Sequence, residues 1–251
     1  MKAKTTPIIQ IHHPLFLEKN IEVWVKLDYK RHTEVQGNKW HKLKLNVREA
    51  QKLNKHTLLT FGGAYSNHIA STAAMAKYLN LNSIGIIRGE ELKHHPEKWS
   101  HTLLKAHQQG MQLEFLNRHN YRLKAQDSFL ERLQMQYPDA FIIPEGGSNH
   151  YAVDGFQEFM QETNQQLPDW THLFTAVGTG GTLAGMTKYA NEGNSLFSAV
   201  ESDKTKQIVG VAVLKNADYL KTQIKIWIGR VNYKNANQVN WELLPQYHLG
   251  G

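Results

Sequence analysis

The stretch Ala176–Gly185, AVGTGGTLAG, leads from an apolar run through glycines into a helical pattern. With its flanks, from 170 to 190, it predicts a strand, a loop and a helix. Glycines let backbone N–H groups approach an anion, threonine hydroxyls add donors, and a helix start carries a partial positive charge. We interpret this as a phosphate-binding loop, with a ligand-free tight turn as the alternative. Its candidate residues are Gly178, Thr179, Gly180, Gly181 and Thr182.

The alternation of strand and helix continues upstream of this loop. Strand patterns cover 21–28, 56–61, 83–89, 111–117 and 140–147, and helix patterns cover 42–54, 66–80, 98–110 and 121–138. This order predicts an α/β fold with mainly parallel, twisted sheets. In such sheets ligands bind at the carboxyl ends of strands. The turns GGAYSN and PEGGSN, which follow two of the strands, are therefore further candidates for a site.

The composition of the 251 residues narrows the class of protein. Hydrophobic residues make up 41% and no apolar run could span a bilayer, so we expect a soluble protein without a membrane partner. No secretory signal pattern is visible, which favours the cytoplasm. The absence of cysteine excludes disulfides and thiolate chemistry. The net charge of +7 favours small anionic ligands. Because the basic residues are scattered, we expect no nucleic-acid partner.

Two other chemistries find little support in the sequence. The pairs His12–His13 and His94–His95 lack the spacing of metal ligands, so no metal site is expected. No GxSxG elbow is present, which argues against an unrelated α/β hydrolase.

The segment 61–71, FGGAYSNHIAS, places Ser66, Asn67 and His68 at the start of an alanine-rich helix. Ser66 or Asn67 is a candidate N-cap residue. The N–H groups of the same helix start are also a candidate site for a substrate carboxylate or a cofactor hydroxyl. For His68 a structural or supporting role is favoured over that of a base.

The segment 37–42, GNKWHK, places Lys39 and Lys42 at the start of an amphipathic helix. An isolated lysine is usually a solvated charge. Cations are unfavourable at a helix start, however, so two lysines there suggest a bound anion. A lysine amine together with a phosphate-binding loop suggests pyridoxal phosphate, whose aldehyde condenses with lysine.

The four motifs GNKWHK, FGGAYSNH, PEGGSN and AVGTGGTLAG occur in an order that resembles the fold-type II pyridoxal-phosphate enzymes. More narrowly, they are similar to the 1-aminocyclopropane-1-carboxylate deaminase and D-cysteine desulfhydrase family. The resemblance runs from about Ile8 to the end of the chain. It implies a two-domain, tryptophan synthase β-like architecture, with a larger domain from 1–43 and 144–251 and a smaller inserted domain from 44–143.

The resemblance also implies roles for individual residues. Lys39 would form the Schiff base and, with Ser66, act in catalysis. Lys42 would bind the cofactor phosphate together with the loop residues Gly178, Thr179, Gly180, Gly181 and Thr182. Asn67 would contact the cofactor's ring hydroxyl, and the substrate carboxylate would be received by Ser66, Asn67 and His68. The implied activity is that of a deaminase or lyase acting on D-cysteine or 1-aminocyclopropane-1-carboxylate, in a homodimer.

The end of the chain departs from the family pattern. In similar proteins a segment like YHLGG (247–251) is followed by a tyrosine and several dozen further residues, which supply two tyrosines and the group facing the pyridine nitrogen. We therefore expect a large domain that is incomplete at the C-terminus. A pyridoxal-phosphate-binding or interaction protein with impaired catalysis is the alternative to an active enzyme.

Overall fold

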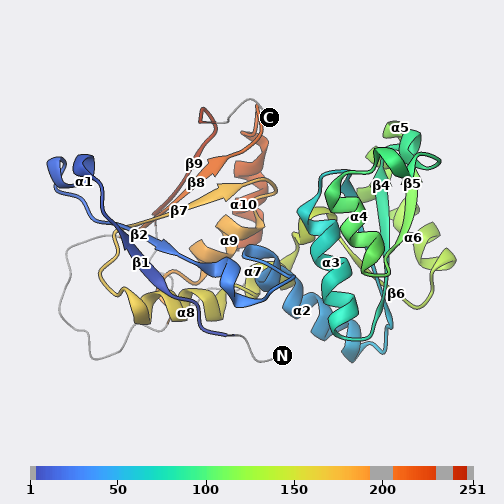
Figure 1. The fold of residues 1–251 in the computed structure, drawn as a ribbon, viewed down its shortest axis with the longest axis horizontal. Coiled ribbons are helices and arrows are strands. Elements are labelled where there is room, and N and C mark those ends of the chain that lie inside the picture. Colours follow the sequence, from blue (N-terminus) through green and yellow to red (C-terminus); the bar gives the residue numbers. More distant parts are fainter. Residues whose placement is uncertain (1–3, 193–205, 230–239, 248–251) are drawn as a thin grey trace. The chain divides into compact units, whose positions relative to one another are not determined.

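The computed structural model describes residues 4–192, 206–229 and 240–247 (Figure 1). The end of the YHLGG segment, 248–251, lies outside these residues. The chain forms two compact units: unit 1 combines Met1–His41 with Val153–Gly251, and unit 2 is Lys42–Ala152. Unit 2 thus extends beyond the expected 44–143. Residues 144–152 pack within it because Lys42 Nζ donates hydrogen bonds to Gly146 O and Ser148 Oγ.

Unit 2 is built on a parallel sheet with the strand order β5-β4-β3-β6. The strands are β3 (Thr57–Gly63), β4 (Asn82–Arg88), β5 (Gln112–Leu116) and β6 (Ala140–Ile143). The helices are α3 (Asn67–Tyr78), α4 (His101–Gln108), α5 (Arg118–Tyr121), α6 (Asp127–Gln136) and most of α2 (Asn38–Lys52), with single turns η2 (Glu90–Leu92), η3 (Pro96–Lys98), η4 (Arg122–Ala125) and η5 (Glu145–Gly147). The prediction of parallel α/β structure is confirmed.

Both faces of this sheet carry a hydrophobic cluster. Ile86 of β4 packs with Tyr121 and Leu133 on one face, and the next residue, Ile87, packs with Ile69 and Leu103 on the other. Successive strand residues point to opposite faces, so a sheet covered on both sides needs a continuous apolar strand. The buried run SIGII in β4, residues 83–87, meets this requirement.

The helix predicted at 121–138 is wrong as a single element. It is divided into the end of α5, the turn η4 and helix α6, because Gln126 is extended, with φ −84° and ψ 134°. On one straight helix Tyr121 and Leu133 would lie about 120° apart around the axis. The break allows both side chains to enter the same core cluster.

Within its described residues, unit 1 contains a parallel sheet of order β7-β8-β9 and an antiparallel pair β1-β2. Its strands are β1 (Ile8–Ile11), β2 (Val23–Lys26), β7 (His172–Val177), β8 (Gln207–Ala212) and β9 (Asn240–Leu244). Its helices are α1 (Pro14–Glu18), α8 (Gln157–Gln166), α9 (Gly181–Lys188), α10 (Tyr219–Gly229) and the turn η1 (Asp28–Arg31), while α7 (His150–Asp154) spans the unit boundary. The predicted strand, loop and helix at 170–190 are confirmed as β7 and α9.

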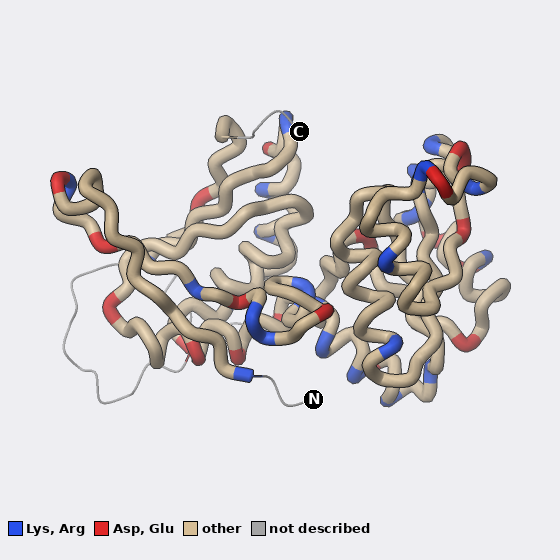
Figure 2. Tube along the Cα trace, viewed as in Figure 1, with Lys and Arg blue, Asp and Glu red and all other residues tan. Residues whose placement is uncertain are grey.

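The distribution of charged residues and the length of the apolar helices add two observations. Lys and Arg are distributed along both units, with Asp and Glu among them (Figure 2). In the part of the chain that the structure describes, no helix has the length and apolarity needed to cross a membrane.

Candidate active site

The glycine loop of unit 1 connects β7 to α9 and ends at Gly180. Gly180 adopts a left-handed conformation, with φ +82°, and a Cβ on it would lie 2.7 Å from Ile224 Cγ1 of α10. Both observations require glycine at this position. Among the described residues no side chain caps α9, so the first amides of the helix, which have no intrahelical acceptors, remain as donors for a ligand. This helix start therefore suits an anion.

Asn38 joins the glycine loop to the start of α2. Its Nδ2 donates a hydrogen bond of 3.0 Å to Oγ1 of the buried Thr182. Because the amide supplies the proton of that bond, the proton of the Thr182 hydroxyl can be donated to another acceptor. The contact brings together two predicted site segments that are distant in the sequence. We did not predict Asn38 itself, and its position directly before Lys39 was the one signal for it.

Lys39 follows Asn38 in the first turn of α2 and is half-buried. Burial lowers its pKa below the usual value for lysine. Across the described residues, no carboxylate or other acceptor binds its Nζ. A desolvated amine without a counter-charge loses its proton more readily, and the neutral amine is the nucleophilic form.

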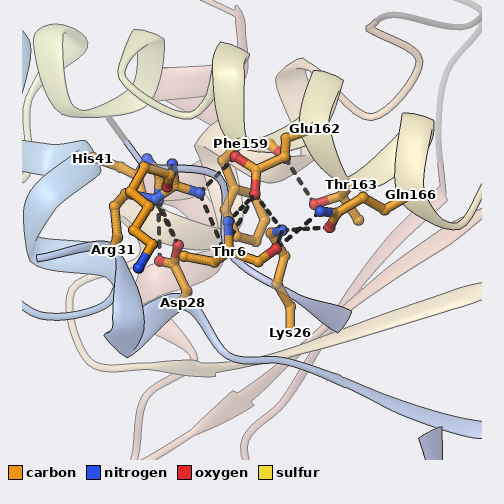
Figure 3. Close-up of polar contacts among 10 residues, drawn as sticks. Thr6, Lys26, Asp28, Arg31, His41, Phe159, Glu162, Thr163 and Gln166 are labelled. Atoms are coloured by element: carbon orange, nitrogen blue, oxygen red, sulfur yellow. Dashed lines mark hydrogen bonds and ion pairs between the residues drawn. The ribbon is translucent and has the colours of Figure 1, made fainter. Parts of the chain in front are cut away.

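A buried network of charges holds the first turn of α2 within unit 1 (Figure 3). His41 Nε2 lies 3.0 Å from Asp28 Oδ2, and Arg31 Nε donates to Asp28 Oδ1 at 3.0 Å. Arg31 also donates to Glu162 Oε2 of α8 at 2.8 Å, and Lys26 Nζ donates to Glu162 Oε1 at 2.7 Å. The network therefore ties β2, η1, α2 and α8 together.

The two carboxylates of this network are stabilised as anions. Burial by itself would raise the pKa of Asp28, but hydrogen bonds and charge from His41 and Arg31 outweigh it and hold that pKa below the ordinary value. The pKa of Glu162 is likewise lowered: burial opposes the shift, and hydrogen bonds from Lys26, Arg31 and the Thr6 amide overcome it. Both groups remain charged near neutral pH.

The second candidate segment lies in unit 2 at the start of α3. Ser66 is the N-cap residue, since its Oγ accepts a hydrogen bond from the Ile69 amide at 3.4 Å. This confirms the capping interpretation for Ser66. Asn67 is exposed and His68 is buried, and their amides are the first two of the helix, without intrahelical acceptors. The geometry leaves room for both capping and anion binding.

Lys42 is buried in unit 2. Its Nζ donates to Gly146 O at 2.8 Å and to Ser148 Oγ at 2.7 Å, so it holds the PEGGSN loop that follows β6. The neighbouring Asn149 donates through its Nδ2 to Asn46 Oδ1 at 2.7 Å. A contact of Lys42 with a cofactor phosphate stays a prediction.

The predicted residues thus fall into two groups, one in each unit. Unit 1 holds Lys39 and the loop Gly178, Thr179, Gly180, Gly181 and Thr182, joined through Asn38. Unit 2 holds Lys42, Ser66, Asn67 and His68, around the GGAYSN and PEGGSN loops. In the described ranges, no group of three or more His, Asp or Glu residues is placed to hold a metal ion.

The chain is similar to two proteins whose names include D-cysteine desulfhydrase. A "Bifunctional D-cysteine desulfhydrase/1-aminocyclopropane-1-carboxylate deaminase, mitochondrial" of Arabidopsis thaliana is 32% identical over 193 residues, which cover 72% of this chain and 48% of that protein. A D-cysteine desulfhydrase of Klebsiella pneumoniae is 28% identical over 171 residues, which cover 66% of this chain and 52% of that protein. The chain therefore spans about half the length of these relatives.

A solved structure and a family model agree with these relatives. The crystal structure of an ACC deaminase homologue superimposes with a TM-score of 0.72 at 23% identity, covering 96% of this chain and 71% of that one. This confirms the fold-type II architecture. The family model described as "Pyridoxal-phosphate dependent enzyme" matches residues 2–248. Because that match covers nearly the whole sequence, the chain belongs to the family of pyridoxal-phosphate dependent enzymes.

Proposed function

We propose that this chain is a pyridoxal-phosphate-dependent lyase or deaminase acting on D-cysteine or 1-aminocyclopropane-1-carboxylate. The observation that carries the proposal is in unit 1. A desolvated lysine without a carboxylate partner among the described residues follows Asn38, which contacts the start of α9 after the glycine loop. The names of the Arabidopsis and Klebsiella relatives support the choice of substrates.

The residues of unit 1 suit two chemical groups of the cofactor, its phosphate and its aldehyde. The first-turn amides of α9 and the hydroxyl proton of Thr182 are all donors, as a phosphate group requires. The amine of Lys39 matches the aldehyde, because burial favours its neutral form. Lys39 and the loop 178–182 would therefore hold the cofactor, with Lys42 and Asn67 as further proposed contacts.

Pyridoxal phosphate, when bound, supplies an electron sink for negative charge at the α-carbon of an amino acid. The chain's own residues then have to orient the substrate and move protons. The amine of Lys39 would take or return a proton near the α-carbon, and its lowered pKa favours the neutral form that accepts a proton. Ser66 is the second proposed catalytic residue. The start of α3 would hold the substrate carboxylate.

The overall reactions balance with water as the co-reactant. D-cysteine and water would give pyruvate, hydrogen sulfide and ammonia. 1-Aminocyclopropane-1-carboxylate and water would give 2-oxobutanoate and ammonia. Release of hydrogen sulfide therefore distinguishes the two substrates, because only D-cysteine yields it.

The test compares the unaltered chain with Lys39→Ala and Lys52→Ala. Lys52 lies on the same helix, but it is exposed and its nearest carboxylate oxygen, on Glu49, is 3.8 Å away, so its replacement is a matched control. After addition of pyridoxal phosphate, borohydride reduction and peptide mass spectrometry should find the cofactor on Lys39. Assays of sulfide, 2-oxo acid and ammonia should find activity in the chain and in Lys52→Ala.

Loss of cofactor attachment and activity in Lys39→Ala alone would support the proposal. Attachment at another lysine would contradict the assignment of Lys39. Attachment without any product would favour a cofactor-binding protein with impaired catalysis. A cytoplasmic location and a homodimer remain predictions from the sequence, and light scattering on the purified chain would test the second.

A further inference from the structure

Thr60 lies in the middle of β3 and is fully buried. Its Oγ1 is 2.9 Å from the carbonyl oxygen of Ile143, its register partner on β6. The same Oγ1 is 2.8 Å from Nε2 of His68, in the first turn of α3. One hydroxyl therefore connects both strands that precede the GGAYSN and PEGGSN loops with the helix that follows the first of them.

The proton positions in this chain of hydrogen bonds follow from its ends. A carbonyl oxygen can only accept, so the single hydroxyl proton of Thr60 is donated to Ile143 O. Thr60 Oγ1 can then only accept from His68, which requires the proton on Nε2. In the neutral imidazole, Nδ1 therefore carries the lone pair.

The Nδ1–Cε1 edge of the His68 ring faces the PEGGSN loop. A Cβ built on Gly147 would lie 3.0 Å from His68 Cε1 and 3.4 Å from Nδ1. Gly147 also has φ +71°, a conformation that side chains with a Cβ rarely adopt. The ring thus fills the space between β3 and this loop, and Gly147 allows the close approach.

We propose that Thr60 is a positioning residue for the substrate site: it fixes the tautomer and orientation of His68, and the His68 ring sets the first turn of α3. The proposal rests on the proposed function of that helix start as a carboxylate site. His68 would then contribute its backbone amide, because Nε2 is engaged by Thr60 and a lone pair on Nδ1 cannot donate to a carboxylate. Ser66 and Asn67 supply the side chains.

The first experiment measures the imidazole ¹⁵N shifts of the unaltered chain. A His68→Gln variant assigns the resonances of His68 among the fourteen histidines. We expect a protonated Nε2 and an unprotonated Nδ1. Thr60→Val, which keeps the shape but removes the hydroxyl, should give a mixture of tautomers, and Thr60→Ser should restore the original pattern. A proton on Nδ1 in the unaltered chain, alone or on a doubly protonated ring, would overturn the proposal.

The second experiment separates positioning from folding by kinetics. Thr60→Val should raise KM roughly five- to tenfold, with a smaller change in kcat, because one buried hydrogen bond that orders the carboxylate site is lost. Thr60→Ser should recover most of the loss. Thr57→Val is the matched control: Thr57 is buried on the same strand, and its hydroxyl binds Asp139 instead.

Equal effects of Thr57→Val and Thr60→Val on KM would indicate a general loss of strand stability and contradict the positioning role. The kinetic and the ¹⁵N experiments also test the proposed function and the role of Thr60 separately. An unaltered chain that turns over neither substrate contradicts the proposed function. The ¹⁵N shifts decide independently whether Thr60 sets His68.

Discussion

The starts of α9 in unit 1 and α3 in unit 2 both follow a parallel strand, yet they are built differently. At α3 the Ser66 hydroxyl caps the helix by accepting from the Ile69 amide. At α9 the cap position is Gly180, and no described side chain accepts from the helix amides. The Ser66 cap satisfies one donor of α3 without a ligand, whereas the first amides of α9 have no side-chain acceptor among the described residues and suit an anion.

The surroundings of the two helix starts differ as well. In unit 1 the adjacent first turn of α2 is held by buried ions, among them Asp28, Arg31 and Glu162. In unit 2 the first turn of α3 is held by a hydroxyl, an imidazole and a carbonyl, from Thr60, His68 and Ile143. Acidic pH, or the loss of a single charged side chain, should therefore weaken the support in unit 1 more strongly than the support in unit 2.

Among the changes that test this comparison, removal of Glu162 should have the largest effect on the free energy of unfolding. Glu162→Ala leaves Lys26 and Arg31 buried without their shared carboxylate, and loss of one member of a buried pair costs about 3 kcal/mol. Urea unfolding, followed by fluorescence of the tryptophans, would measure the lowered free energy of unfolding. Glu97→Ala, at an exposed pair with His95, should change nothing measurable.

The pH dependence gives a second measure of the same network. Asp28 and Glu162 have lowered pKa values in the folded state, so their contribution is complete above the ordinary carboxyl pKa. It is lost as the pH falls below about 4 and through the folded pKa values. Glu162→Ala should therefore flatten the acid side of the stability curve. An unchanged acid slope would contradict the role assigned to the ions.

Gly180→Ala should have the next largest effect, and it tests the α9 junction directly. The new Cβ would meet Ile224 Cγ1 at 2.7 Å in a backbone conformation with φ +82°. Overpacking and backbone strain together cost about 2 kcal/mol. Gly110→Ala is the control, since Gly110 has φ +91° but nothing within 4 Å of a built Cβ. A difference in melting temperature between the two variants measures the packing against α10.

Local patterns predicted the parts of the molecule that depend on local physics. The alternation of apolar runs and helical spacing was sufficient for β3 and β4, because a buried parallel strand needs a continuous apolar sequence. It was also sufficient for β7, which is half-exposed and leads into the glycine loop. The glycines and threonines of the loop 178–182 and the order of the motifs indicated the candidate site. The short strands β1 and β9 were not predicted, since their half-exposed residues give no comparable signal.

Such patterns could not predict contacts between residues that are distant in the sequence. Asn38 and Thr182 are separated by 144 positions, and Thr60 and Ile143 by 83. Neither pair has a periodicity or composition that marks it, because each depends on the closure of a unit around its sheet. The sequence therefore indicated candidate site residues, whereas the structure was needed to find the residues that contact them.

The smallest expected effects come from a crossed pair of variants, Ser66→Ala and Thr182→Val. Ser66→Ala removes the cap of α3 and should lower the stability of the cofactor-free protein by about 1 kcal/mol. Thr182→Val removes the acceptor of the half-buried Asn38 amide, so it should lower that stability by a similar amount. The two variants should differ in their binding of pyridoxal phosphate, followed as the rise in melting temperature with cofactor concentration.

In that titration Thr182→Val should need more cofactor for the same rise, because the proposed phosphate donor at Thr182 is lost. Ser66→Ala should keep the rise while starting from a lower melting temperature. If Ser66→Ala weakened the cofactor response as strongly as Thr182→Val, the Ser66 hydroxyl would also contribute to cofactor binding. The contrast between a self-capped helix and a ligand-completed helix would then be wrong for this chain.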